Sequence, residues 1–311
     1  MHVVGKAELE ASLARLRAEI SDPRAGILGP DSAAWRIGGD LALFLGGGRA
    51  AMLQLAHPAV AQAIEDHSAT RADAAGRFQR TFTAVFAMIF GTLDAAFTAA
   101  RRVHAVHSRI RGVLPSGAPY EANDAAALRW VHATLVDTVL VVRERLDGEL
   151  PLSIKDAYIG EMRRFAALFG IDSAPDFASH DRYMATMLAP SSQLAVLPCA
   201  REMAGFLVGR GDAQPRLGAV AERLTASLLP PHLAAAFGLR TAPRRVRLGL
   251  GAFGALYARL PPAAVAIPAH AAARSRLGGA PASAWTTRVD RAVLWLATRT
   301  SGTGGASSRR P

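Results

Sequence analysis

The chain has 311 residues, half of them hydrophobic, and its 36 basic and 25 acidic residues give a formal net charge of +11. The single cysteine, Cys199, excludes an intrachain disulfide framework and a cysteine-ligated zinc site, and we expect it to be a small buried apolar residue. The basic residues are nearly all arginines spread along the chain, whereas a nucleic-acid-binding protein usually clusters them on one face. We therefore expect no nucleic-acid partner, although a basic surface favours acidic partners or anionic membranes.

The sequence contains no recognisable targeting segment. Residues 1–20 are amphipathic with charges throughout, unlike a signal peptide. The longest apolar region, residues 41–64, is interrupted by three glycines, Arg49 and a His-Pro pair, so it is too broken for a membrane span. These features predict a soluble cytoplasmic protein for which peripheral membrane contact stays open, and they do not predict an oligomeric state.

The hydrophobic period is helical almost everywhere, and strand-like alternation is nearly absent. Asn123-Asp124 is a capping signal before a long apolar helix, and Gly112, Gly117 and Pro119 interrupt the chain just before it. The pattern indicates an all-α, single-core protein. Helices are predicted near residues 6–20, 33–45, 48–65, 73–90, 94–111, 123–147, 153–169, 177–188, 200–210, 214–228, 243–259 and 284–299.

Composition divides the chain into three segments. Residues 1–34 are predicted to be an N-terminal helix and linker, residues 35–300 an all-helical domain, and residues 301–311 a disordered tail rich in Gly and Ser. Within the domain, the Pro-, Gly- and Ala-rich residues 259–281 are predicted to be a connector.

Two glycine motifs do not carry the functions that their patterns suggest. GLGAFG at residues 249–254 matches the dinucleotide fingerprint, but no strand precedes it and the next acid, Asp290, is too distant. Helix packing or a loop is the better interpretation. GGGR at residues 46–49 lacks the Gly-Lys-Ser/Thr ending of a phosphate loop and is more typical of a flexible helix start. No nucleophile elbow accompanies the histidines.

Two histidines lie in RRVHAVHSRIRG, residues 101–112, which is helical in pattern. Ala100, Val103, Val106 and Ile110 define the apolar side of this helix; His107 lies beside them and His104 is turned toward the polar flank. His107 is therefore the more plausible inward-facing imidazole. It would be either a hydrogen-bonded core residue or a metal ligand, and the residues alone favour the core interpretation.

A polar group lies on the otherwise apolar helix RFQRTFTAVFAMIFG, residues 77–91. Arg77, Arg80 and Thr81 fall at positions i, i+3 and i+4, so they share a face. The default interpretation is the solvated face of an amphipathic helix. Alternatively, another helix covers this face and encloses a cofactor whose anionic groups the arginines would neutralise. Periodicity does not decide between these two interpretations.

The ordered words RAAMLQLAHPAVAQAIEDHS, RFQRTFTAVFAMIFG, RRVHAVHSRIRG and YEANDAAALRWVHATLVDT resemble the catalytic domain of the rubber oxygenases (latex-clearing proteins) and the related MpaB-type oxygenases. The resemblance runs from about residue 35 to about residue 190. It implies a helical bundle that encloses a cofactor-sized apolar pocket holding haem b. It also implies use of dioxygen on an apolar, isoprenoid or lipid-like substrate, with cleavage of a carbon–carbon double bond.

The resemblance assigns roles to individual positions. It makes His107 the proximal iron ligand, and it places Arg77 and Thr81 in the distal region as cofactor-binding residues. Where the rubber oxygenases have a lysine that can ligate iron, this chain has Arg80, which cannot deprotonate. We therefore predict Arg80 and Thr81 as the catalytic donors toward bound oxygen, and a substrate smaller than polyisoprene.

Several further residues belong to the same words. His57, before Pro58, is predicted either to line the cofactor pocket or to start a helix structurally. Glu65 or Asp66 is a weak candidate base, since its spacing from the arginines does not match the family pattern. Three other side chains are predicted to be structural: Met88 in the pocket wall, Tyr120, and His132 as a hydrogen-bonded core residue beside Trp130.

A different class of function competes with the oxygenase. The loss of the lysine at position 80 is equally compatible with a non-catalytic helical binding protein that keeps an apolar pocket and binds no haem.

Overall fold

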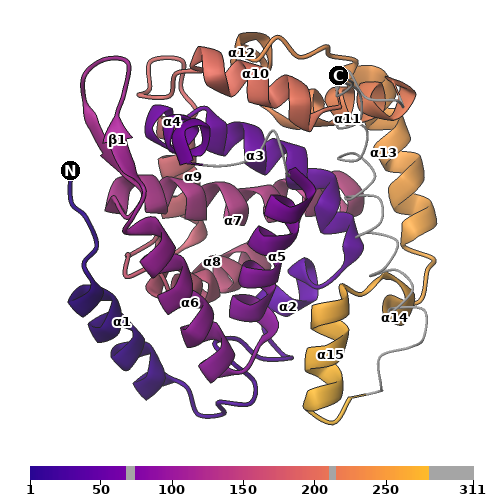
Figure 1. The fold of residues 1–311 in the computed structure, drawn as a ribbon. Coiled ribbons are helices and arrows are strands. Elements are labelled where there is room, and N and C mark those ends of the chain that lie inside the picture. Colours follow the sequence, from indigo (N-terminus) through magenta and orange to yellow (C-terminus); the bar gives the residue numbers. More distant parts are fainter. Residues whose placement is uncertain (68–73, 210–214, 280–311) are drawn as a thin grey trace, which may run out of the picture.

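Helices form nearly all of the computed structural model, which describes residues 1–67, 74–209 and 215–279 (Figure 1). The all-α prediction is confirmed. The elements in chain order are α1 (Lys6–Glu19), α2 (Ala33–Gly38), the 3-10 helix η1 (Leu41–Gly46), α3 (Gly47–Leu55), α4 (Pro58–His67), α5 (Ala74–Phe90), α6 (Leu93–His107), β1 (Arg111–Val113), β2 (Pro119–Glu121), α7 (Ala125–Asp147), α8 (Leu152–Ala167), α9 (Phe177–Met187), α10 (Pro198–Leu207), α11 (Pro215–Leu228), α12 (Pro231–Ala236), α13 (Pro243–Tyr257), α14 (Pro262–Val265) and α15 (Pro268–Arg276).

Short polar side chains and prolines set the helix starts. Asp124 accepts a hydrogen bond from the amide of Ala127 and so caps α7, as the Asn123-Asp124 signal predicts. Thr92 caps α6 in the same way through the amide of Ala95. Helices α10, α12, α13, α14 and α15 each begin with a proline, whose missing N–H costs nothing in the first turn of a helix.

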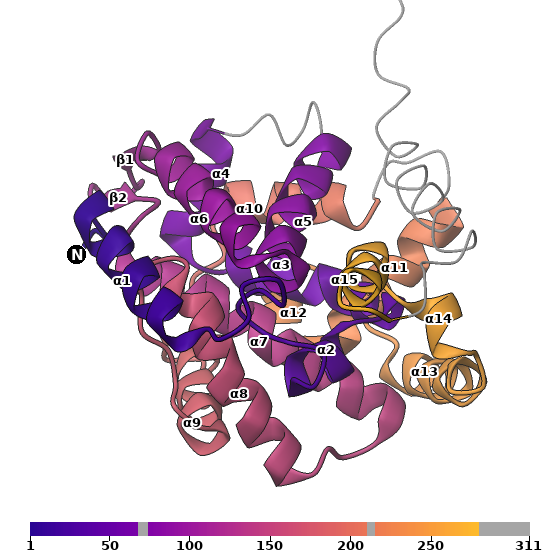
Figure 2. The same ribbon diagram turned by 90° about the horizontal axis from the view of Figure 1, so that it is seen from below.

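The long helix α7 organises the core. It packs against η1, α3, α8, α9 and α13, and other helices surround it in both views (Figures 1 and 2). Of the described helices, α7 is the one long and apolar enough to cross a membrane, but 67% of that stretch is buried inside the protein, as in a core helix.

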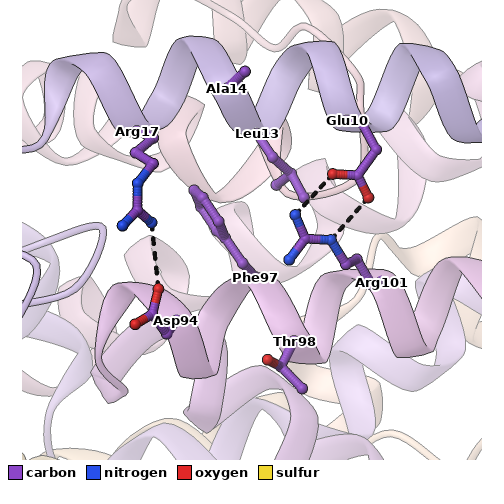
Figure 3. Close-up of a pocket in the computed structure, with 8 residues that line it drawn as sticks. All are labelled: Glu10, Leu13, Ala14, Arg17, Asp94, Phe97, Thr98 and Arg101. Carbon is purple, nitrogen blue, oxygen red and sulfur yellow. Dashed lines mark hydrogen bonds and ion pairs between the residues drawn. The ribbon is translucent and has the colours of Figure 1, made fainter.

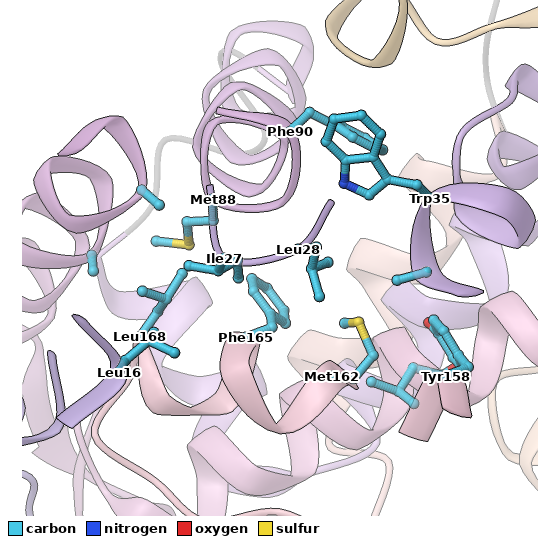
Figure 4. Packing of buried hydrophobic residues seen from close by; sticks show 14 of the residues in the cluster. Leu16, Ile27, Leu28, Trp35, Met88, Phe90, Tyr158, Met162, Phe165 and Leu168 are labelled. Atoms are coloured by element: carbon cyan, nitrogen blue, oxygen red, sulfur yellow. The ribbon is translucent and has the colours of Figure 1, made fainter. Parts of the chain in front are cut away.

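The buried side chains gather in two large clusters, and α7 contributes to both. One cluster joins α1, α2, α5, α6 and α8 and includes Met88, Phe165 and the packed pair Trp35 and Phe90 (Figure 4). The other joins α3, α4, α9, α10 and α12 around Trp130 and Phe237. Cys199 is half-buried at the edge of this second cluster.

Two predicted helices are each divided in the structure. The helix predicted at 33–45 becomes α2 and η1, because Asp40 leaves the helical conformation and caps η1 through the amide of Ala42. The helix predicted at 48–65 becomes α3 and α4. Pro58 lacks an N–H and cannot continue α3, so it begins a new helix instead.

Two other segments also differ from the prediction. Helix α6 ends at His107, and Arg111–Val113 pairs antiparallel with Pro119–Glu121, so a short hairpin replaces the last helical turn. The predicted connector 259–281 contains α14 and α15, and α15 packs against α5. The predicted helix 284–299 and tail 301–311 lie outside the described residues.

Each of the two glycine motifs contains at least one glycine in close packing. GLGAFG lies within α13, and a Cβ on Gly254 would come within 2.8 Å of the carbonyl oxygen of Leu146. The helix-packing interpretation of this motif is confirmed. In GGGR, a Cβ on Gly46 would overlap Thr138 of α7, so this helix start is tightly packed rather than flexible.

Candidate functional site

Helices α5 and α6 form a hairpin joined by Gly91 and Thr92, and they diverge from this connection in both views (Figures 1 and 2). The aromatic stripe of α5 faces inward. Phe44 of η1 packs against Phe82 and Phe86, with ring centroids 5.2 and 6.2 Å apart. Met88 is buried at 1% exposure, in line with its predicted place in an apolar wall.

The predicted distal residues lie toward the start of α5, away from the turn. The side chains of Arg80 and Thr81 are exposed, as expected for the polar face of this helix. Arg77 belongs to α5, but its side chain lies outside the described part of the structure. Because α6 runs back along α5, its last residue, His107, is also far from the turn.

The His107 ring is neutral near pH 7 and has a nitrogen without a hydrogen-bond partner. Its Nδ1 atom is buried and has no hydrogen-bond partner. Burial, reinforced by the positive charge of His104, lowers the pKa of His107 to about 4, so the ring is neutral near pH 7. An unpaired buried ring nitrogen is costly in a finished core, but it is what an axial metal ligand presents before the metal arrives.

His104, one turn earlier, is predicted on the polar flank of the helix, but its side chain is half-buried like that of His107. The Nε2 atom of His104 lies 2.9 Å from the carbonyl oxygen of Val4, so this ring nitrogen already has a hydrogen-bond partner in the N-terminal segment. The prediction that Val106 lies on the apolar, buried side of this helix is wrong, because Val106 is 53% exposed. The N-terminal segment covers the His104 side of α6, and this long-range contact shifts the buried face away from Val106.

Sequence reasoning treated Asn123 only as part of a cap, but this residue also supports His107. Asn123 is buried, and its amide donates to the carbonyl oxygen of His104 at 3.2 Å. The side chain of Asn123 also partly opposes the fall in the pKa of His107. Asn123 therefore ties the loop before α7 to the last turn of α6, beside the candidate imidazole.

Of the two roles predicted for His57, the structure shows the helix start, and the lining of a cofactor pocket stays a prediction. It precedes Pro58, and its carbonyl accepts the amide of Ala61, so it starts α4. Its Nδ1 atom is nevertheless buried without a partner, and burial lowers the pKa of the ring despite the opposing charge of Asp124. The structure thus supports the helix-start role and leaves a second imidazole nitrogen available.

Asp66 is committed to a structural contact. Its carboxylate accepts hydrogen bonds from the Tyr120 hydroxyl at 2.5 Å and from the Gln62 amide at 2.8 Å. The bond from Tyr120 is the main reason that the pKa of Asp66 falls below its usual range. A carboxylate with a lowered pKa is a weaker base, which argues against a role for Asp66 as a catalytic base. Tyr120 is structural as predicted, because this bond ties the hairpin to α4.

His132 is a hydrogen-bonded core residue, as predicted. It is 6% exposed, its Nε2 atom lies 3.0 Å from the carbonyl oxygen of Met162, and burial lowers its pKa to about 4. Its neighbour Trp130 donates to the carbonyl oxygen of Leu53.

A buried ionic network lies beside α7, and sequence reasoning missed it. Arg49 of α3 is 3% exposed and reaches the Asp137 carboxylate at 2.6 Å, the Thr138 hydroxyl at 2.9 Å and the Leu228 carbonyl at 2.8 Å. Burial would raise the pKa of Asp137, but hydrogen bonding to His180 and the charge of Arg49 outweigh it and lower this pKa. The only available signals were a lone arginine and a lone aspartate inside apolar helices.

Two cavities in the structure lie away from His107, Arg80 and Thr81. A shallow groove of about 380 Å³ runs between α1 and α6, flanked by the Arg17–Asp94 and Arg101–Glu10 ion pairs (Figure 3). A second cavity of about 240 Å³ lies among α7, α8 and α9, with His132 and His180 in its lining. The second is smaller than the ~300–1,000 Å³ of typical ligand pockets. Neither is the cofactor-sized pocket, which stays a prediction.

The described side chains include no group of three or more His, Cys, Asp or Glu residues placed to hold a metal ion. A single imidazole, however, is enough to hold an iron porphyrin, because the macrocycle supplies the other ligands. That mode of binding at His107 stays a prediction.

Comparison with known proteins supports the resemblance to the oxygenase family. A family model described as "ER-bound oxygenase mpaB/B'/Rubber oxygenase, catalytic domain" matches residues 35–260, more than half of the chain. No curated protein and no solved structure matches the chain. The matched range contains all five candidate site residues, His57, Arg77, Arg80, Thr81 and His107.

Proposed function

The chain belongs to the family of mpaB-type and rubber oxygenase catalytic domains, and we propose from this that it is an oxygenase dependent on haem b. Its substrate would be an apolar, isoprenoid or lipid-like molecule that reacts with dioxygen, with cleavage of a carbon–carbon double bond as the expected reaction. The burial of α7 in the core supports a soluble protein, for which we propose a cytoplasmic location.

The buried, unpaired nitrogen of His107 is the observation that carries this proposal. The lowered pKa of the ring means that no proton has to leave before iron binds near pH 7. Asn123 donates to the carbonyl oxygen of His104 and so fixes the backbone of α6 one turn before His107. These residues fit a haem: His107 would hold the iron, and a bound haem would supply iron-based activation of dioxygen.

The other candidate residues act by charge and by exclusion of water. Arg77 would pair with a haem propionate, which a guanidinium matches with two parallel donors. Arg80 and Thr81 would donate hydrogen bonds where negative charge develops on oxygen, and His57 would line the cofactor site. The stripe of Phe82, Phe86 and Met88 supplies an apolar wall that keeps water out.

Haem content tests the proposal directly. Protein purified from haem-supplemented cells is expected to be coloured, with a Soret band near about 400 nm. His107→Ala should abolish the band, since no other residue is proposed to hold the iron. His104→Ala is the matched control and should keep it, because His104 is bonded to the backbone of Val4.

The competing function predicts the opposite result. A folded protein that stays colourless and takes up no haem would be the non-catalytic binding protein, and the oxygenase proposal would then be wrong. Loss of colour in both histidine variants would instead assign the effect to damage of α6 rather than to iron ligation.

A further inference from the structure

Exposed large apolar side chains are most frequent on one part of the surface. Exposed leucine, valine and phenylalanine residues concentrate on α10, α11, α13 and the turn after α13, namely Leu207, Leu217, Val220, Leu248, Phe253, Leu256 and Leu260. Helix α13 carries Leu248, Phe253 and Leu256, packs beside α11, and lies at the edge of the molecule in both views (Figures 1 and 2).

The inner face of α13 is fixed by packing. Gly254 sits close against the backbone of Leu146, and the Tyr257 hydroxyl is 3.1 Å from the carboxylate of Asp40. The helical period then turns Leu248 and Leu256 outward, where they are 74% and 62% exposed.

Arginines lie at both ends of this apolar face, and the stretch of chain that forms it carries no acid. Arg244 and Arg245 are exposed at the start of α13, and Arg259 is exposed just after its end. The sequence has no Asp or Glu between Glu222 and Asp290. Glu222 itself is buried and paired with Arg240, so it does not offset the positive charge of the surface.

We propose that this face, defined by Arg244, Arg245, Leu248, Leu256 and Arg259, docks the protein on an anionic lipid bilayer. A helix with exposed leucines and flanking arginines lies in the interface, with its apolar side among the acyl chains and its cations near lipid phosphates. A second copy of the chain fits the face poorly, because pairing two such faces would bring their arginines together without a carboxylate between them. This inference is independent of haem binding.

Vesicle flotation of the full-length protein tests the docking face. The protein is expected to float with vesicles of phosphatidylcholine and phosphatidylserine in equal parts, and to bind vesicles of phosphatidylcholine alone much more weakly. Added salt should reduce binding, because it screens the arginines. Arg244→Ala/Arg245→Ala should weaken partition about 20–30-fold, from roughly fivefold for each arginine near an anionic surface.

Removal of the apolar part tests the second half of the proposal. Leu248→Ser/Leu256→Ser should weaken partition roughly tenfold or more, because the leucines would no longer enter the acyl region. Both positions are exposed, so the variant should fold, which circular dichroism would check. The matched controls are Leu152→Ser, at a leucine with 61% exposure on α8, and Arg102→Ala/Arg163→Ala; these should bind like the parent protein.

Three results would overturn the proposal. The first is equal binding to both vesicle types, and the second is equal loss in the control variants. The third is a parent protein that does not float. If size measurement by light scattering then shows a dimer that Leu248→Ser/Leu256→Ser dissociates, a second copy covers the face instead.

Discussion

Arg49 is a buried cation of α3 whose hydrogen bonds join α3 to α7 and to the end of α11. Its three nitrogen donors are all used, and its partner Asp137 also interacts with His180, 3.5 Å away. Removing one member of a buried ion pair leaves the other charge uncompensated in a medium of low dielectric constant. Replacing only one of the two residues should therefore lower the free energy of unfolding more than replacing both.

We expect Arg49→Met to lower the free energy of unfolding by about 3–5 kcal/mol in urea titrations at pH 7. Arg145→Met, at an exposed position of α7, is the control and should change it by less than about 0.5 kcal/mol. The double variant Arg49→Met/Asp137→Leu should recover part of the loss, since it removes both charges. If the single variant is as stable as the parent, Arg49 does not neutralise Asp137 in solution.

Arg80 gives a second test at the residue scale. A lysine at this position can deprotonate and coordinate iron, whereas an arginine cannot. In haem-loaded protein, Arg80→Lys is expected to shift the absorption spectrum toward that of a six-coordinate haem, and Arg102→Lys should leave it unchanged. An unchanged spectrum in Arg80→Lys would show that this side chain does not reach the iron.

At the scale of elements, the start of α3 depends on how closely it approaches its neighbours. A Cβ on Gly46 would overlap Thr138 of α7, and a Cβ on Gly48 would overlap Thr225 of α11. Gly47 between them faces open space and begins α3. Three consecutive glycines therefore have two different roles.

This difference predicts that replacing glycine by alanine has opposite effects on stability at neighbouring positions. Gly46→Ala and Gly48→Ala should each destabilise the protein by about 1–3 kcal/mol, because the added methyl group forces two helices apart. Gly47→Ala should be neutral or stabilise it by up to about 1 kcal/mol, since alanine loses less backbone entropy in a helix. Thermal unfolding of the three variants would compare them, and a similar effect in all three would contradict the packing described here.

The sequence predicted most long helices to within a few residues because their hydrophobic period is strong, as in α5, α7 and α8. It did not predict the β1–β2 hairpin, whose strands are three residues each and too short for a pattern of alternation. The role of Asn123 depends on that hairpin, which returns the chain to α6 through the bond from Ala122 to Ile110. A local pattern carries no signal for such a contact.

The candidate site shows the same limit. The helical period placed His107 beside the apolar stripe. Whether a nitrogen of this ring finds a hydrogen-bond partner depends on the atoms that folding brings around it, and here Nδ1 has none. Arg49 and Asp137 are separated by 88 positions, so their pairing is visible only after folding. The proposal of His107 as an iron ligand rests on the resemblance to a family, and periodicity alone favoured a hydrogen-bonded core histidine.

For the whole molecule, buried histidines make stability depend on pH in a defined window. His132 is neutral in the folded protein because burial lowers its pKa to about 4, whereas an unfolded histidine titrates near its ordinary value of 6.5. Between these two values the unfolded chain binds more protons than the folded one. The contribution of His132 is thus fully present above about pH 6.5 and is lost as the pH falls toward 4.

We expect the free energy of unfolding to fall by about 2 kcal/mol through His132 between pH 7 and pH 5, as measured by urea titration of the haem-free protein. Acidic residues with lowered pKa values, such as Asp66 and Asp137, act below this window, so histidines dominate within it. His132→Gln keeps a donor for the carbonyl of Met162 but cannot titrate, so it should reduce the slope by up to about 1.4 kcal/mol per pH unit. Identical slopes in parent and His132→Gln would mean that His132 is already protonated, or exposed to water, in the folded protein.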